Sequence, residues 1–176
     1  MGNTIIEIKE LSKSFRNKNV LNNLSLSIPK GSVYGLLGRN GEGKTTLIKC
    51  ILGFLKPSSG IVSDRECTIF FSTHITSDLE RIADHVAVLK DGKIDFCGEL
   101  GQLKDEVKRL RVTTQQPIPQ NYNLHGLIYC ESSKSEAIIT VRGFKNEIKN
   151  QIEHEFKAKV EIEDLNLEEI FLELNR

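Results

Sequence analysis

The feature that most constrains this sequence is a glycine-rich turn between a short apolar segment and a segment with helical periodicity, over residues 33–52. From Gly38 to Thr45 the turn follows the pattern G-x-x-x-x-G-K-[ST] without a mismatch. Glycine adopts positive φ without a Cβ clash, so Gly38, Gly41 and Gly43 allow the backbone to curl until successive N–H groups face inward. The helix expected after Gly43 adds unpaired amides and the positive end of its dipole. The pattern predicts a phosphate-binding P-loop.

The segments on either side of the turn support this interpretation. Val33–Leu37 is short and apolar, as expected of a buried strand. Beyond the turn, apolar residues recur on one helical face, namely Leu47, Ile48, Ile51 and Leu52. In such a loop Lys44 reaches the β- and γ-phosphates, and the hydroxyl of Thr45 ligates Mg²⁺. The alternative, a glycine-rich turn with a chance lysine, is disfavoured by this context.

The composition narrows the class of protein. The chain has 176 residues, which suits one domain or two small ones. Its formal net charge is zero, so the charge gives no argument for a nucleic-acid partner. Apolar runs are too short for a membrane helix, and we expect a soluble, cytoplasmic protein. The cysteines lack C-x-x-C spacing, which favours reduced thiols over disulfides or a metal site: Cys50, Cys67, Cys97 and Cys130.

The P-loop lies within a longer stretch that carries a family resemblance. The residues ELSKSFRNKNVLNNLSLSIPKGSVYGLLGRNGEGKTTLIKCILGFLKPSSG, and the segment from Thr4 to Gly60 as a whole, resemble the opening of an ATP-binding-cassette transporter ATPase. The resemblance implies an α/β fold with a P-loop NTPase core, in which a parallel sheet has flanking helices, plus an N-terminal antiparallel sheet. It also implies that the protein binds ATP with Mg²⁺, and that Phe15 stacks on the adenine. From the residue alone, the less favoured alternative is a core or edge phenylalanine.

The same resemblance implies further nucleotide contacts and shows two departures from the family pattern. The implied contacts come from Gly38, Asn40, Gly41, Gly43, Lys44, Thr45 and Thr46, with Thr45 also on Mg²⁺. Arg39 stands where the family commonly has proline, and Glu42 where it commonly has a small residue. We expect the carboxylate of Glu42, close to the phosphates, to weaken nucleotide affinity slightly.

A second region of resemblance begins after residue 67. Thr68–Glu80 is similar to the switch-histidine region of the family, which implies that His74 meets the γ-phosphate. His85 lacks that context and is interpreted as structural.

Asp91-Gly92 predicts a tight hairpin. Related folds imply that the strand before His74 lies beside the P-loop strand, with the strand before Asp91 on its other flank. Residues 68–71 would then form an exposed apolar edge that favours self-association.

Between these two regions the sequence lacks several parts of the family pattern. We find no glutamine loop, helical subdomain, signature sequence, or strand with the magnesium aspartate and catalytic glutamate, and the junction lies near Ser63-Asp64. Three hypotheses stay open: an internally shortened transporter ATPase subunit with weak or absent hydrolysis, a nucleotide-responsive interaction module without catalysis, and a scaffold with a vestigial P-loop. In the family, the partners are a transmembrane permease and a second ATPase subunit at the inner face of the membrane.

The rest of the chain predicts a second, smaller module. We expect a shortened nucleotide-binding domain over residues 1–112, which ends in a helix around Leu100–Leu110, a proline-containing linker over 113–125, and an α+β module over 126–176. The module should contain strands 126–130, 137–141 and 159–163, and an amphipathic helix over 145–157. Asn166 with Glu169 predicts the cap of a last helix. The ending DLNLEEIFLELNR resembles that of ATPase subunits in drug- and peptide-exporting transporters. The charged faces of this module are interpreted as solvated surface.

Overall fold

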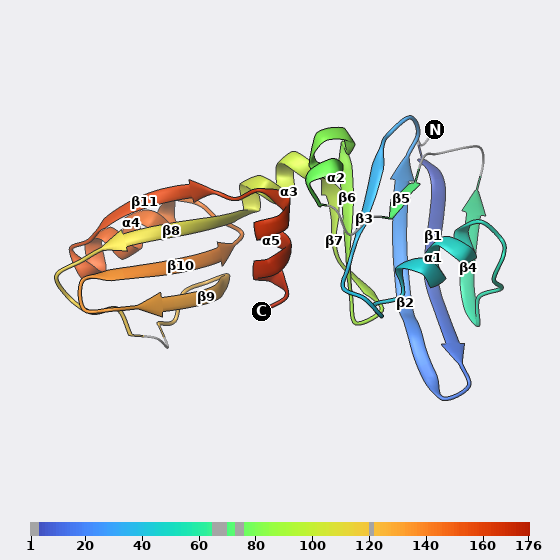
Figure 1. Ribbon diagram of the computed structural model, residues 1–176, viewed down its shortest axis with the longest axis horizontal. Coiled ribbons are helices and arrows are strands. Elements are labelled where there is room, and N and C mark those ends of the chain that lie inside the picture. Colours follow the sequence, from blue (N-terminus) through green and yellow to red (C-terminus); the bar gives the residue numbers. More distant parts are fainter. Residues whose placement is uncertain (1–3, 65–69, 73–75, 120–121) are drawn as a thin grey trace. The chain divides into compact units, whose positions relative to one another are not determined.

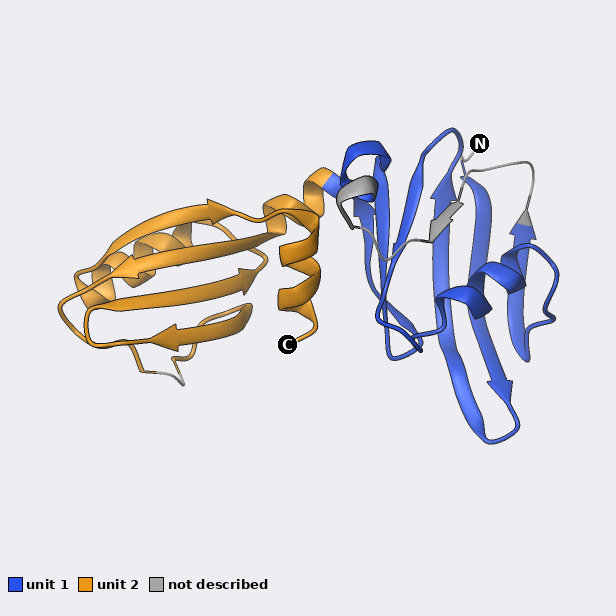
Figure 2. Cartoon of the chain, viewed as in Figure 1, with its two compact units in different colours: residues 1–100 blue, residues 101–176 orange. Residues whose placement is uncertain are grey.

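The computed structural model describes residues 4–64, 70–72, 76–119 and 122–176. It contains two compact units, Met1–Leu100 and Gly101–Arg176, which are coloured separately in Figure 2. Both combine helices and strands, in the order drawn in Figure 1.

An antiparallel sheet forms the N-terminal part of the first unit. Its strand order is β2-β1-β4, with β1 (Thr4–Phe15) in the centre, β2 (Lys18–Pro29) joined to it by a hairpin, and β4 (Ser59–Asp64) on the other side. The predicted alternation in β2 is confirmed, because the leucines and Ile28 are buried while the serines between them are exposed. This sheet therefore has one apolar face, which packs on the rest of the unit.

The second sheet of this unit carries the P-loop. Its order is β5-β3-β6-β7, with β3 (Tyr34–Leu37) parallel to β5 (Phe70–Ser72) and to β6 (His85–Lys90). β7 (Lys93–Glu99) returns antiparallel to β6. The predicted placement of the P-loop strand between its two parallel neighbours is confirmed. The three carboxyl ends share one edge of the sheet, where ligands bind in open α/β folds.

Among the described residues this unit contains the helices α1 (Lys44–Ile51) and α2 (Thr76–Ile82), while α3 (Leu100–Glu106) begins at its last residue and otherwise belongs to the second unit. The helix α1 packs its apolar face into the same core as β1, β2 and β3, through Leu47, Cys50 and Ile51. Leu52, expected on that face, instead follows the helix and is 57% exposed. The core thus fixes the helix that leaves the P-loop.

The second unit is a four-stranded antiparallel sheet with the order β11-β8-β10-β9. Its elements are β8 (Val107–Thr113), β9 (Leu127–Ser132), β10 (Glu136–Arg142), α4 (Asn146–Phe156), β11 (Lys159–Asp164) and α5 (Leu167–Leu174). The helix α4 buries Ile148, Ile152 and Phe156 in a core with the sheet. The strands, amphipathic helix and capped last helix predicted for this region are all present.

The structure differs from the predicted boundaries between the modules. The helix expected up to Leu110 ends at Glu106, and β8 pairs with both β10 and β11. The expected domain end at residue 112 therefore lies inside the central strand of the second unit. The expected linker 113–125 also belongs to that unit, because Thr114, Ile118, Tyr122 and Leu124 are buried there. Buried apolar residues 107, 110 and 112 are spaced so that they fit a helix or a strand, and only pairing decides between them.

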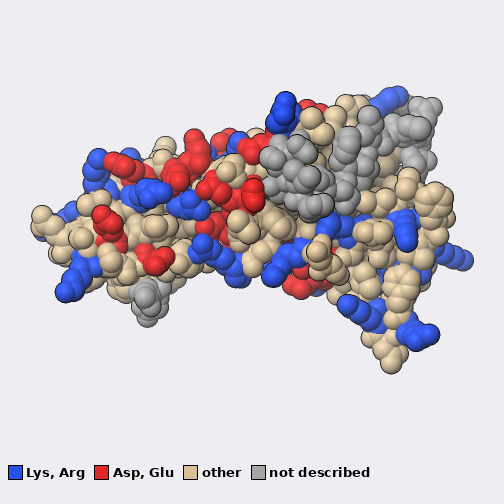
Figure 3. Space-filling model, viewed as in Figure 1, with Lys and Arg blue, Asp and Glu red and all other residues tan. Residues whose placement is uncertain are grey.

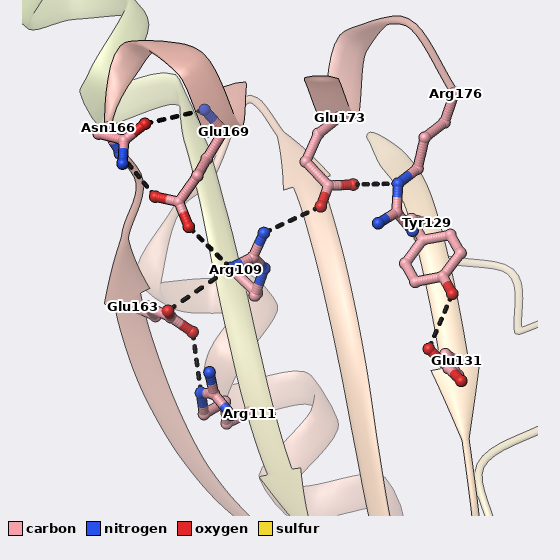
Figure 4. A network of polar contacts seen from close by, with 9 residues as sticks. All are labelled: Arg109, Arg111, Tyr129, Glu131, Glu163, Asn166, Glu169, Glu173 and Arg176. Atoms are coloured by element: carbon pink, nitrogen blue, oxygen red, sulfur yellow. Dashed lines mark hydrogen bonds and ion pairs between the residues drawn. The ribbon is translucent and has the colours of Figure 1, made fainter. Parts of the chain in front are cut away.

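The charged residues of the second unit are not all solvated, contrary to the prediction. Arg109 lies opposite Glu163 across β8 and β11, and its guanidinium contacts Glu163, Glu169 and Glu173 at 3.0–3.5 Å. The side chain of Glu173, on α5, is only 3% exposed. Figure 4 shows Arg109 between these carboxylates, and Figure 3 shows charges of both signs intermixed on the visible surface of this unit. Ion pairs therefore help to hold α5 on the sheet.

Candidate functional site: the P-loop

The P-loop backbone connects the carboxyl end of β3 to the first residue of α1. Gly41 and Gly43 have φ values of +93° and +100°, the region that glycine enters without strain. Gly43 is the N-cap of α1 and offers no side chain to the helix, whose first main-chain bond runs from the amide of Leu47 to the carbonyl of Gly43, at 2.8 Å. The amides of residues 44–46 thus have no acceptor within the helix, which is the arrangement that binds phosphate.

At Gly38 and Gly43, close packing also leaves no room for a Cβ atom. A Cβ atom on Gly38 would lie 2.9 Å from the carbonyl oxygen of Leu89, at the end of β6. On Gly43 it would lie 2.8 Å from the side chain of Leu21 and 3.0 Å from the carbonyl oxygen of Val20, both on β2. A Cβ on Gly41 would meet nothing within 4 Å, so only its φ requires glycine. The two ends of the loop are therefore set by close packing.

The Lys44 side chain folds back over the loop. Its Nζ donates to the carbonyl oxygens of Gly38 and Arg39, at 2.5 and 3.0 Å. An ammonium has three N–H donors, so one remains for another acceptor. Burial lowers the pKa of Lys44, while the carboxylate of Glu42 acts in the opposite direction. A positive charge is thereby held at the same loop as the unpaired amides.

The remaining predicted contacts differ in exposure. Asn40 and Thr45 are exposed and Thr46 is half-buried. Thr45 is the second residue of α1 and the predicted Mg²⁺ ligand. Among the residues that the structure describes, no group of three or more histidine, cysteine or acidic side chains could hold a metal ion. A lone hydroxyl fits Mg²⁺ that arrives with a nucleotide, because Mg²⁺ keeps several waters and takes phosphate oxygens.

Phe15 lies at the end of β1 and is 47% exposed, which excludes the core reading of this residue. Phe15 pairs with Lys18 across the β1–β2 hairpin. Val20, two residues further along β2, has its carbonyl close to Gly43. The ammonium of Lys13 lies 5.2 Å from the centre of the ring. The β1–β2 hairpin thus carries a half-exposed aromatic ring, which the Lys13 ammonium approaches, and also contacts the P-loop.

His74 lies outside the described residues, and its role stays a prediction. β5 ends at Ser72, whose partner in β3 is Leu36, and α2 begins at Thr76. His85, interpreted as structural, stacks on Tyr34 with the ring centres 6.0 Å apart.

Sequence reasoning missed one part of the site. The carboxylate of Glu42 accepts a hydrogen bond from the main-chain amide of Asp91, in the turn between β6 and β7. The departure of Glu42 from the family pattern was the available signal, but its partner is 49 residues away. Local patterns carry no information about such a pair.

Comparison with known proteins gives a family match over most of the chain. The sequence profile described as ABC transporter matches residues 21–168. An uncharacterized ABC transporter ATP-binding protein of Bacillus subtilis is 29% identical over 126 residues, which are 70% of this chain and 39% of the relative. The galactose/methyl galactoside import ATP-binding protein of Treponema denticola is 44% identical over 63 residues, or 36% of this chain and 13% of the relative. The chain therefore spans well under half the length of these relatives.

Solved structures agree on the fold. One described as an ATP binding subunit of an ABC transporter has a TM-score of 0.53 and 17% identity, over 58% of this chain and 92% of that one. The structure of a nucleotide-free ATP-binding cassette from an ABC transporter has a TM-score of 0.51 and 15% sequence identity. The match covers 55% of this chain and 91% of that one. The predicted α/β P-loop fold is confirmed. In the part of the chain that the structure describes, no helix has the length and apolar character needed to span a membrane.

Proposed function

Because this chain belongs to the ABC transporter family, we propose that it is a transporter ATPase subunit that binds Mg·ATP at Gly38–Thr46. The observation that carries the proposal is the set of amides without an acceptor inside the helix at the start of α1, framed by Gly38 and Gly43 and accompanied by the ammonium of Lys44. Phosphate groups bind to such a helix start. Thr45 would ligate the Mg²⁺ that accompanies the phosphates.

The adenine would stack on Phe15. The exposure of this ring and the contact of its hairpin with Gly43 support the assignment. Stacking on an aromatic ring is worth about 1–3 kcal/mol per base and tolerates any base. Phe15 would therefore add affinity, with little selection between purines.

We further propose that this chain hydrolyses ATP weakly or not at all by itself. The segments that would supply the magnesium carboxylate, the catalytic glutamate and the signature loop are not found in the sequence near residues 63–64. Phosphoryl transfer depends on such groups to stabilise charge and position water. Each lost preorganised donor typically costs about 10²–10³ in rate. His74 would not replace them.

The proposed partners follow from the family. A transmembrane permease and a second ATPase subunit would bind this chain at the inner face of the cell membrane. The substrates named for relatives, such as galactosides, belong to those proteins.

Titration of the purified chain with Mg·ATP, followed by calorimetry, tests the binding proposal. We expect saturable binding that Lys44→Ala abolishes, because the loop loses its only charged phosphate ligand of the motif. Lys49→Ala, in the last turn of α1, is the matched control and should bind like the wild type. A wild-type chain that folds but gives no heat would favour the vestigial scaffold instead. Appreciable ATP turnover would contradict the proposed loss of hydrolysis.

A further inference from the structure

The side chain of Glu42 leaves the P-loop and joins it to another part of the first unit. Its carboxylate accepts from the amide of Asp91, while its own amide donates to the carbonyl of Arg39 within the loop, at 3.3 Å. Glu42 is therefore bonded to the loop through its main chain and to the β6–β7 turn through its side chain.

The Asp91–Gly92 turn, to which Glu42 is bonded, is itself packed closely against β2. Asp91 and Gly92 have φ values of +51° and +72°, as in a tight two-residue hairpin. The carbonyl of Gly92 accepts from the amide of Asn22 at 2.9 Å, and a Cβ on Gly92 would lie 2.5 Å from the carbonyl oxygen of Val20. Since Val20 also approaches Gly43, the turn and the end of the P-loop rest on the same segment of β2.

The middle of the P-loop has less support than its ends. Gly38 and Gly43 are packed so closely that neither tolerates a Cβ without movement. Arg39, Asn40 and Gly41 are exposed, and a Cβ on Gly41 would meet no atom. A glycine in an open segment loses more conformational freedom on ordering than any other residue. A tie at Glu42 would therefore act directly beside the segment whose ordering costs most.

We propose that Glu42 is a positioning residue that ties the P-loop, just after its open segment 39–41, to the Asp91–Gly92 turn and so holds the loop amides ready for phosphate. The inference rests on the proposed binding of nucleotide at this loop. A loop ordered beforehand binds more tightly because less entropy is lost on binding. The negative charge of the same carboxylate repels phosphate, so the two effects of Glu42 oppose each other.

Three substitutions separate position from charge. Glu42→Gln keeps an acceptor oxygen and removes the charge, so the Kd for Mg·ATP should equal or fall below that of the wild type. Glu42→Ala removes the acceptor and should raise the Kd about tenfold, equivalent to about 1.4 kcal/mol. Glu42→Asp keeps the charge on a side chain one methylene shorter and should bind at least as weakly as Glu42→Ala. Glu99→Gln and Glu99→Ala, at the exposed end of β7, are the controls and should match the wild type.

A measurement without nucleotide keeps this test separate from that of ATP binding. Amide hydrogen exchange in residues 38–43 and 91 should be faster in Glu42→Ala and Glu42→Asp, and unchanged in Glu42→Gln. Wild-type exchange rates in all three variants would overturn the tie, and so would equal loosening in Glu42→Gln and Glu42→Ala. If Glu42→Ala does not fold, the contrast between Glu42→Asp and Glu42→Gln decides. Altered exchange with no ATP binding by the wild type would refute only the proposed function.

Discussion

Gly38 lies where the P-loop leaves no room for a Cβ atom beside the carboxyl end of β6. The Cβ of an alanine there would lie 2.9 Å from a main-chain oxygen of β6, so the strand or the loop must move. We expect Gly38→Ala to lower the free energy of unfolding by about 1–3 kcal/mol, as overpacking typically does, and to weaken Mg·ATP binding. Thermal unfolding and calorimetry measure the two effects.

The control for this prediction is Gly101→Ala. A Cβ at Gly101 meets nothing within 4 Å, and the residue lies in α3. Alanine in a helix is more favourable than glycine by about 0.5–1 kcal/mol, so this variant should be slightly more stable than the wild type. If Gly38→Ala behaves like Gly101→Ala, the close contact with β6 is not a constraint on the loop.

At the scale of elements, α5 begins with a complete capping box. The side chain of Asn166 accepts from the amide of Glu169 at 2.9 Å, and the carboxylate of Glu169 accepts from the amide of Asn166 at 3.0 Å. We expect Asn166→Ala to destabilise the second unit by about 1 kcal/mol in chemical denaturation. Asn146→Ala is the matched control, because α4 begins at that residue without any side-chain cap. A similar loss in both variants would mean that the cap contributes nothing specific.

The ion pairs between β8 and β11 predict a dependence of stability on pH. The hydrogen bond from Arg111, together with the charges of Arg111 and Arg109, holds the pKa of Glu163 below its ordinary value of 4.5. A lowered folded-state pKa stabilises the fold fully above pH 4.5, and this stabilisation is lost as pH falls through the folded-state pKa. We therefore expect the free energy of unfolding to fall as the pH is lowered below 4.5, and Glu163→Gln to reduce that fall.

Denaturation with urea at several pH values measures this effect. The control is Glu136→Gln, at an exposed residue of β10 that lies outside the ion pairs of Glu163 with Arg109 and Arg111, and it should keep the wild-type pH dependence. An unchanged slope in Glu163→Gln would show that the pairs of Glu163 do not stabilise the folded state.

For the whole molecule, the order of the parallel sheet leaves β5 at one edge, next to β3. A strand at the edge of a sheet can pair with another chain, so we predict self-association that grows with protein concentration. Size-exclusion chromatography with light scattering measures it. A lysine on an edge strand blocks pairing, so Phe71→Lys should reduce the association. Phe54→Lys removes an apolar side chain that is 80% exposed outside the sheets and is the control. A wild-type chain that stays monomeric at high concentration would contradict the prediction.

The sequence predicted much of the fold, and the reasons are local. The turn at Gly41 and Gly43, the alternation in β2 and the cap at Asn166 each depend on residues a few positions apart. The family resemblance also predicted the order of the parallel strands, which the spacing of residues in the sequence does not indicate. The strand β8 was predicted as a helix up to Leu110, because its buried positions suit either structure.

By itself, then, the sequence determined that a glycine-rich turn with the P-loop pattern precedes a helix, since the glycines and the lysine lie within one short segment. Only the tertiary structure decided that Glu42 is bonded to Asp91, and that Arg109 pairs with Glu173, which is 64 residues away. Both contacts form because the fold brings together segments distant in sequence: the P-loop and the β6–β7 turn in one case, and β8 and α5 in the other. Charge and hydrophobic periodicity report which side of an element is buried, and they do not report which partner it meets.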